Sequence, residues 1–300
     1  MNIYDIIIIG GGPAGLTAAV YALRANKKVL VLEKGTFGGQ ITSSPKVENI
    51  PGFLSVTGNE FAEKLVEQAL NLGAEIECAE VTGLNDGEVK TVITDEGEFY
   101  GKAVIIATGT KHRLLGIDRE EEFIGDGISF CAVCDGAFYD GKTVAVIGGG
   151  NSALQEAILL SEGAKKVYVV QNLDYLTGED KLVKQLEKKD NVEIILGYVV
   201  ESITGDNNLE GIIIKNNSGE LKALDIDGMF TAIGLIPQNE PFSSVIKLND
   251  WGYVDSGEDC RTSIDGIFVA GDCRSKRIRQ VATAAADGAV AALAACDYIK

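Results

Sequence analysis

The fold is decided by Asp5-Ile6-Ile7-Ile8-Ile9-Gly10-Gly11-Gly12-Pro13-Ala14-Gly15, an apolar run followed by a glycine-rich turn. A continuous run of β-branched residues is typical of a strand that is buried on both faces of a parallel sheet. Residues 16–23 indicate a helix, and residues 28–32 form a second apolar strand that ends at Glu33. Strand, glycine turn, helix and a second strand ending in an acid are the context that dinucleotide binding requires.

The glycines of this turn have separate roles in binding a dinucleotide. Gly10 permits the tight turn, Gly12 lets the backbone approach a pyrophosphate, and Gly15 lets the helix pack closely on the strand. The N-terminus of the helix attracts the phosphates. Glu33, about 20 residues beyond the turn, can accept a hydrogen bond from a ribose hydroxyl. We therefore predict dinucleotide binding here, in preference to an empty Rossmann-like unit.

The same pattern occurs a second time in the chain. The repeat consists of strand residues 143–147, the turn Gly148-Gly149-Gly150-Asn151-Ser152-Ala153, helix residues 154–161 and strand residues 166–170. Each unit is followed by a predicted β meander, at residues 75–84, 88–94 and 98–100 and again at residues 192–203, 209–215 and 220–224. Strand residues 104–109, which end in Ala107-Thr108-Gly109, are echoed by residues 229–234. The chain thus holds two copies of one unit.

This repeat predicts the fold class and the domain organisation. We expect an α/β protein with two Rossmann-like, three-layer (ββα) domains of the dinucleotide-binding type, the second inserted in the first. Pro237 and Pro241 mark the expected return to the first domain. The expected boundaries are residues 1–112 and 244–300 for the discontinuous first domain and residues 113–243 for the second.

Between the two units lies Phe130-Cys131-Ala132-Val133-Cys134-Asp135-Gly136. A Cys-x-x-Cys pair can close and reopen a disulfide, and one of its thiols often has a lowered pKa. Zinc would need further ligands, but Cys78, Cys260, Cys273 and Cys296 are scattered and His112 is the single histidine, so no metal is expected. A purely structural disulfide in so tight a loop would stabilise little. A redox-active disulfide is the favoured interpretation. For His112, we favour a surface or interdomain position over a role as a proton relay.

Composition limits the classes of function. The 300 residues suffice for about two domains, and 46% hydrophobic with 24% charged residues is the composition of a soluble globular protein. A net charge of −17 argues against nucleic acid as a partner. No leader sequence and no apolar run of the ~20 residues that a membrane helix needs is evident. We expect a cytoplasmic protein without a membrane segment.

Taken together, the two units, the Cys-x-x-Cys-Asp motif, the Ala-Thr-Gly strand and a C-terminal Gly271-Asp272 resemble the low-molecular-weight thioredoxin reductases over essentially the whole chain. The resemblance implies FAD in the first domain, a redox disulfide on the second domain, thioredoxin as substrate and a homodimer. It places the flavin-side contact at Cys134, the exchange thiol at Cys131 and the acid/base at Asp135. The residues that it implies for FAD are Gly10, Gly12, Pro13, Ala14, Gly15, Glu33, Lys34, Gly39, Gln40, Asn49, Val81, Ala107, Thr108, Gly109, Gly271, Asp272, Arg279, Gln280, Val281 and Ala282.

One departure from this family concerns the electron donor. NADPH-dependent members carry His-Arg-Arg-x-x-x-Arg after the second strand of the second unit, where this chain has Gln171-Asn172-Leu173-Asp174-Tyr175-Leu176-Thr177. No cation is left to hold the 2′-phosphate, and each lost charged hydrogen bond is worth ~1.5–3 kcal/mol. Neither Gln171 nor Asn172 supplies an acid for the ribose of NADH. The chain therefore resembles the ferredoxin-dependent flavin thioredoxin reductases, whose second domain is expected to bind no nucleotide.

Ferredoxin or flavodoxin is then the expected electron donor. Ferredoxins are acidic, so an acidic enzyme needs a basic docking patch, and the stretch at residues 274–279 provides Arg274, Lys276, Arg277 and Arg279. The alternative is a solubilising loop. Rival functions are an NADH-dependent disulfide reductase of the same fold and a flavin dithiol oxidase that passes electrons to oxygen. A redox-inert FAD-binding protein would leave Cys131, Cys134 and Asp135 without a role.

Overall fold

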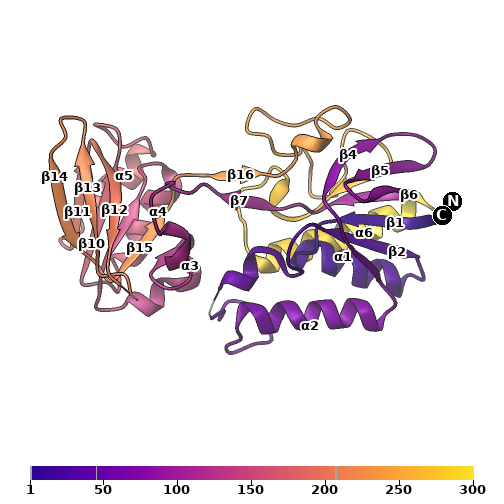
Figure 1. Ribbon diagram of the computed structural model, residues 1–300, viewed down its shortest axis with the longest axis horizontal. Helices are drawn as coiled ribbons and strands as arrows, with labels where there is room; N and C mark the ends of the chain where they lie inside the picture. Colours follow the sequence, from indigo (N-terminus) through magenta and orange to yellow (C-terminus); the bar gives the residue numbers. More distant parts are fainter. Residues whose placement is uncertain (1, 45, 207) are drawn as a thin grey trace. The chain divides into compact units, whose positions relative to one another are not determined.

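A computed structural model describes residues 2–44, 46–206 and 208–300, and the chain divides into two compact units (Figure 1). The first unit comprises Met1–Lys111 and Ile236–Lys300, and the second comprises His112–Leu235. The chain re-enters the first unit at Ile236, earlier than the boundary expected at residue 244. The physical reason is Phe242, which is already buried in the core of the first unit.

The first unit is built on one seven-stranded sheet. Its strands are β1 (Ile3–Ile9), β2 (Val29–Glu33), β3 (Glu75–Cys78), β4 (Val81–Asn85), β5 (Lys90–Thr94), β6 (Gly97–Ile106) and β17 (Ile267–Val269). The order is β3-β2-β1-β6-β5-β4, with β17 also paired to β6. The pairs among β3, β2, β1, β6 and β17 are parallel, whereas β5 is antiparallel to β6 and β4 is antiparallel to β5.

Both faces of this sheet are buried, as the β-branched run predicted. Ile6 and Ile8 of β1 pack in one core cluster with the helices α1 (Pro13–Arg24) and α6 (Val281–Tyr298). Ile7 and Ile9 point into a second cluster on the opposite face. The helix α2 (Gly58–Asn71) begins after Thr57, whose side chain accepts a hydrogen bond from the Glu60 amide at 3.1 Å.

The second unit contains two sheets. Its five-stranded parallel sheet has the order β11-β10-β9-β15-β8 and consists of β8 (Ile128–Ser129), β9 (Thr143–Ile147), β10 (Lys166–Gln171), β11 (Val192–Leu196) and β15 (Gly228–Thr231). An antiparallel sheet consists of β12 (Tyr198–Thr204), β13 (Gly211–Asn216) and β14 (Leu221–Asp225). Its helices are α3 (Ala132–Asp135), α4 (Asn151–Leu160) and α5 (Asp180–Leu186).

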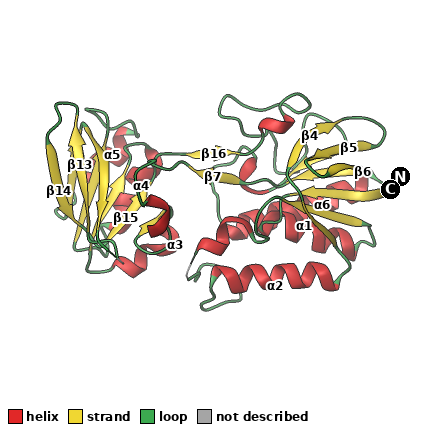
Figure 2. Ribbon diagram, viewed as in Figure 1, coloured by secondary structure: helices red, strands yellow, loops and turns green. Residues whose placement is uncertain are grey.

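These elements form the expected three layers (Figure 2). On one face of the parallel sheet, Val144 and Val146 pack with residues of α4 and α5. On the other face, Ala145 and Ile147 pack with Ile212 and Ile214 of the antiparallel sheet. The alternation along β9 therefore places one layer of helices and one layer of strands on opposite sides, which confirms the ββα architecture.

The predicted meanders are wrong in one respect in each unit. Residues 75–84 and 192–203 were each expected to form one strand of a meander, but both segments are split. β3 and β11 extend the parallel sheets, and only β4 and β12 belong to antiparallel hairpins. Gly197, with φ of +75°, separates β11 from β12, because a left-handed residue ends the strand. Residues 98–100 and 104–106 lie in one continuous strand, β6, which pairs with β1 from Tyr100 to Ile106, and residues 107–109, expected to continue the strand, lie beyond its end.

The two connections between the units pair with each other. β7 (Thr110–His112) and β16 (Leu235–Pro237) form a two-stranded sheet where the chain leaves and re-enters the first unit. Among the residues placed in the structure, no helix has both the length and the apolar character needed to cross a bilayer.

Candidate active site

The first glycine turn has the geometry of a phosphate-binding turn. Gly10 has φ of +113°, and a side chain at this position would collide with the carbonyl of Ala107 at the end of β6. Gly15 lies directly against the carbonyl of Gly10. At Gly12, by contrast, the nearest atoms that a Cβ would meet are 3.9 Å away, so the backbone is open there. Gly12 caps α1 without a side-chain hydrogen bond, which leaves the amides of the first turn free for an anion.

Glu33 at the end of β2 is fixed beside this turn. Its Oε2 accepts a hydrogen bond from the Gly11 amide at 2.7 Å, and its Oε1 accepts one from the Gly35 amide at 2.9 Å. Each carboxylate oxygen can accept a second hydrogen bond, so a ribose hydroxyl can still be bound. The neighbouring Lys34 instead forms an exposed ion pair with Glu80 at 3.0 Å, one residue before Val81.

Segments far apart in the sequence meet near the same turn. Gly39 lies opposite Gly12, since a Cβ on Gly39 would be 3.2 Å from the Gly12 Cα. The side-chain amide of Gln40 donates a hydrogen bond to the carbonyl of Thr110, which follows the segment Ala107-Thr108-Gly109 at the end of β6. Asn49 Nδ2 donates to Gln280 Oε1 at 3.2 Å across 231 positions of sequence. The structure thus brings Gly39 to Gly12 and Asn49 to Gln280 within the first unit.

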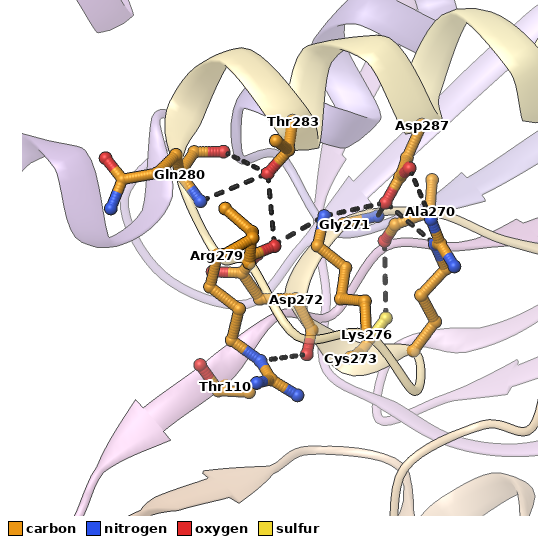
Figure 3. Close-up of polar contacts among 12 residues, drawn as sticks. Thr110, Ala270, Gly271, Asp272, Cys273, Lys276, Arg279, Gln280, Thr283 and Asp287 are labelled. Atoms are coloured by element: carbon orange, nitrogen blue, oxygen red, sulfur yellow. Dashed lines mark hydrogen bonds and ion pairs between the residues drawn. The ribbon is translucent and has the colours of Figure 1, made fainter. Parts of the chain in front are cut away.

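The turn Gly271–Asp272 presents a carboxyl group in this region (Figure 3). Gly271 has φ of +80°, and Asp272 Oδ1 is buried without a hydrogen-bond partner in the described part of the chain. Burial raises the pKa of Asp272, an effect that Lys276 and Arg279 offset in part. Arg279 Nε donates to the carbonyl of Asp272 at 3.3 Å, and Gln280 begins α6 with a capping box, followed by Val281 and Ala282.

These features fit FAD. An open glycine turn with free amides suits a pyrophosphate, and a fixed acid beside it suits a ribose. Asp272 Oδ1, which accepts no hydrogen bond from the described residues, suits a ligand with hydroxyl donors, because a buried acceptor without a hydrogen bond is costly.

The second unit carries the disulfide. Cys131 and Cys134 are bonded, with their Cα atoms 5.3 Å apart, and Cys131 caps the short helix α3. The Cys134 amide donates to Cys131 Sγ at 3.2 Å. A backbone donor aimed at this sulfur favours its thiolate form, so Cys131 is suited to be the nucleophile after reduction.

Asp135 is held beside the disulfide by Ser129, a residue that the sequence analysis missed. Ser129 Oγ donates to Asp135 Oδ2 at 2.6 Å and accepts a hydrogen bond from the Cys131 amide at 3.1 Å. Asp135 Oδ1 has no partner among the described residues. Burial raises the pKa of Asp135, and the Ser129 hydrogen bond offsets this only in part. A carboxyl group with a raised pKa can hold and release a proton closer to neutral pH.

His112 ends the connecting strand β7 and is the first residue of the second unit. Its ring stacks on Phe130, the residue before Cys131, with the ring centroids 4.3 Å apart. Burial lowers the pKa of His112 to about 4. The imidazole is therefore neutral at physiological pH and is a packing group beside the disulfide turn.

The second glycine turn resembles the first, since Gly150 caps α4 without a side-chain hydrogen bond and a Cβ there would meet only Thr177 Oγ1, at 3.7 Å. A Cβ on Gly149 would lie 2.6 Å from the side chain of Gln171, which ends β10 as Glu33 ends β2. The amides of Thr177 and Gly178 both donate to the Gly149 carbonyl, at 2.9 and 3.0 Å. At the start of α4, Asn151 exchanges two hydrogen bonds with Glu179, at 2.7 and 3.1 Å. The residues after β10 thus lie against Gly149 as Phe37 and Gly38 lie against Gly11 in the first unit, so the two turns are packed alike and the difference lies in the charges that follow β10.

The expected docking patch at residues 274–279 is largely wrong. Arg274 is buried and paired with Asp287, with Nη2 and Oδ1 2.8 Å apart, and the Lys276 side chain is buried and paired with Asp287 at 2.9 Å. Arg279 stacks over the Tyr253 ring at 4.4 Å. Only Arg277 of the four cations is exposed. The reason is Asp287 of α6, and a lone acid in an alanine-rich helix near clustered cations was the signal in the sequence.

Comparisons with known proteins agree with this geometry. Residues 4–288 match the family model described as pyridine nucleotide-disulphide oxidoreductase. The chain is 40% identical over 302 residues to a thioredoxin reductase of Bacillus subtilis, covering 100% of this chain and 96% of the relative. It is 44% identical over 299 residues to a 34.2 kDa protein in the rubredoxin operon of Clostridium pasteurianum, covering 98% of this chain and 97% of that protein.

Solved structures give the same result. A thioredoxin reductase from Streptococcus pyogenes superposes with a TM-score of 0.94 at 38% identity, covering 99% of this chain and 98% of that one. A thioredoxin reductase from Giardia duodenalis gives a TM-score of 0.93 at 35% identity, covering 99% of each chain. The chain therefore belongs to the pyridine nucleotide-disulphide oxidoreductases and, within them, to the low-molecular-weight thioredoxin reductases, flavin-dependent disulfide oxidoreductases whose cofactor is FAD.

Proposed function

We propose that this flavoenzyme reduces thioredoxin with electrons from reduced ferredoxin or flavodoxin, without a nicotinamide nucleotide. The observation that carries the proposal is the charge of the loop that follows β10, beside the second glycine turn. Gln171 stands against Gly149, and the amides of Thr177 and Gly178 are bound to the Gly149 carbonyl. Residues 171–177 contain no cation for a 2′-phosphate, and Glu179 brings a negative charge to the start of α4. A 2′-phosphate would find no cation in this loop and would meet the negative charge of Asp174 and Glu179.

FAD, when bound, collects single electrons and passes them on as a pair. We assign its pyrophosphate to the backbone around Gly12, its adenosine ribose to Glu33 and its ribityl hydroxyls to Asp272. The remaining residues near this cradle, Gly39, Gln40, Asn49 and Gln280 among them, would orient the flavin. Each of these assignments rests on the position of the residue in the first unit.

The dithiol chemistry belongs to Cys131, Cys134 and Asp135. Two electrons and two protons convert the Cys131–Cys134 disulfide to two thiols, with Asp135 as the nearby group that holds and transfers a proton. The Cys131 thiolate then attacks the disulfide of thioredoxin, and one thioredoxin sulfur leaves as a thiolate. Cys134 attacks the resulting mixed disulfide, which releases the second thioredoxin thiol and restores the Cys131–Cys134 bond. Two electrons and two protons have then reached thioredoxin.

Anaerobic flavin reduction tests the donor. We expect reduced ferredoxin to bleach the flavin absorbance and to produce thioredoxin thiols, whereas NADPH and NADH leave the flavin oxidised over the same period. Rapid bleaching by either nucleotide would contradict the proposal and make the chain a nucleotide-driven reductase. Peroxide production from dithiols in air, without ferredoxin activity, would instead support a dithiol oxidase.

Asp135→Asn tests the proton-transfer role. The substitution keeps a group that can bond Ser129 but removes the titration, so we expect turnover with thioredoxin to fall by roughly 10²–10⁴. Because burial raises the pKa of Asp135, the wild-type pH–rate profile should contain an ionisation above the usual aspartate range, and the variant should lack it. Stopped-flow rates between pH 5 and 9 measure both. A variant profile that keeps this ionisation would assign it to another group.

The docking surface, assembly and compartment stay proposals. Arg277 is the exposed cation of the stretch 274–279, so a ferredoxin dock there would be small.

We propose a homodimer in the cytoplasm, as the family resemblance implies. Val290 and Leu293 of α6 support an interface, since they are 39% and 51% exposed. Sedimentation of the wild type and of a Leu293→Glu variant would test it.

A further inference from the structure

A cluster of buried charges lies beside the turn that carries Asp272 (Figure 3). Arg274 and Lys276 both bind Asp287, which is 7% exposed although it lies on the alanine-rich helix α6. Two cations and one anion leave this group with a net charge of +1. The nearest further anion is Asp272, whose Oδ1 is 3.9 Å from Lys276 Nζ. The extra buried cation therefore has its counter-charge in the Asp272 carboxylate.

Asp287 fixes the backbone of this turn. Its Oδ2 accepts hydrogen bonds from the Gly271 amide at 3.1 Å, from Arg274 Nε at 2.8 Å and from Lys276 Nζ at 2.9 Å. Gly271 is left-handed and is the first residue of a single 3-10 turn, Gly271–Cys273, so its amide has no acceptor within that turn. The side chain of Asp287 thus supplies the acceptor for the Gly271 amide that a backbone carbonyl would provide in a regular helix or strand.

Lys276 connects Asp287 to Asp272. Its ammonium group is a compact charge on a flexible stem, yet its side chain is only 8% exposed and one hydrogen bond ties it to Asp287. The ammonium group is thereby held near an Asp272 oxygen that has no hydrogen bond among the described residues. We propose that Lys276 is a positioning residue of the flavin site, which keeps the Asp272 carboxylate ionised and in place for a hydroxyl of bound FAD.

This role rests on the proposed assignment of Asp272 to FAD. Burial alone would favour the neutral form of Asp272, which turns one acceptor oxygen into a donor. Arg279 and Asp287 also face Asp272, and their charges oppose each other. Lys276 is the nearest cation that neutralises the site, so its charge decides whether the turn offers FAD an acceptor.

Lys276→Met tests the proposal, because it removes the charge and leaves the Arg274–Asp287 pair intact. FAD is removed from the full chain, and its dissociation constant is measured by the change in flavin fluorescence on rebinding. Without the Lys276 charge, the Asp272 carboxylate should lose its charged hydrogen bond to a hydroxyl of FAD. The loss of such a bond corresponds to about tenfold weaker binding or more, and we expect a change of this size in the dissociation constant of FAD. Lys276→Arg should restore most of the affinity. Arg277→Met removes an exposed cation from the same loop and serves as the matched control, with affinity unchanged.

A double-mutant cycle separates positioning from a general structural effect. In an Asp272→Asn background the carboxylate is absent, so Lys276→Met should add little further loss of FAD affinity. Equal losses in both backgrounds, or no loss in the wild-type background, would overturn the proposal. If Lys276→Met lowers the unfolding temperature of the FAD-free chain as much as that of the loaded chain, Lys276 is only structural. If Asp272→Asn itself leaves FAD affinity unchanged, the assignment of Asp272 fails, while the donor proposal is untouched.

Discussion

Cys131→Ser and Cys134→Ser should each lower thioredoxin reduction by roughly 10³-fold or more, since each removes one half of the dithiol. The two variants should differ in what they accumulate. Cys134→Ser keeps the thiol that attacks thioredoxin but lacks the one that resolves the mixed disulfide. It should therefore trap a covalent complex with thioredoxin, seen on a non-reducing gel after reduction of the enzyme, whereas Cys131→Ser should not.

The reason for this asymmetry lies in the backbone of α3. The Cys134 amide donates to Cys131 Sγ at 3.2 Å and favours a thiolate there, as a helix N-terminus does for other reactive cysteines. Cys78→Ser is the control, because Cys78 is an exposed free cysteine in the other unit and activity should be unchanged. Trapping by Cys131→Ser instead of Cys134→Ser would exchange the two roles.

The fold was predictable because its signals are local. The run Asp5–Ile9 has no polar side chain within the strand after Asp5, and this predicted burial on both faces; the structure confirms it through the two clusters that share β1. The break at Gly197 was missed, since a glycine in an apolar segment also fits a strand with a bulge. Whether the residues before such a break join the parallel or the antiparallel sheet depends on pairing partners far along the chain, which no local pattern specifies.

The candidate site was predictable only where a residue acts by its position in a motif. Gly12 and Cys131 follow from their neighbours in the sequence. Asp287 and Ser129 act through contacts made by folding. Asp287 contacts Arg274 only because α6 packs against the turn that precedes it. This contact buries Arg274 and Lys276, two of the four cations that the sequence predicted for a docking patch. A cluster of charges in a sequence thus gives no information on which of them remain exposed.

That burial has a consequence for stability, which Asp287→Ala measures. The substitution leaves a guanidinium and an ammonium group buried without their partner, and it removes the acceptor of the Gly271 amide. Breaking a buried ion pair by removing one partner costs about 3–5 kcal/mol of the free energy of unfolding. Urea unfolding of the FAD-free chain, followed by circular dichroism with each transition fitted separately, measures this loss.

The matched control is Glu122→Ala, which breaks the Arg119–Glu122 pair at 2.9 Å, where the glutamate side chain is 64% exposed. An exposed pair of this kind contributes about 0–1 kcal/mol, so the control should unfold almost as the wild type does. Asp287→Asn should fall between the two, because its amide oxygen can still accept from Gly271 but carries no charge for the two cations. A loss below about 1 kcal/mol in Asp287→Ala would mean that water or a rearranged loop replaces the lost partner. The two cations would then be free to reach the surface, and a docking role for Lys276 would return.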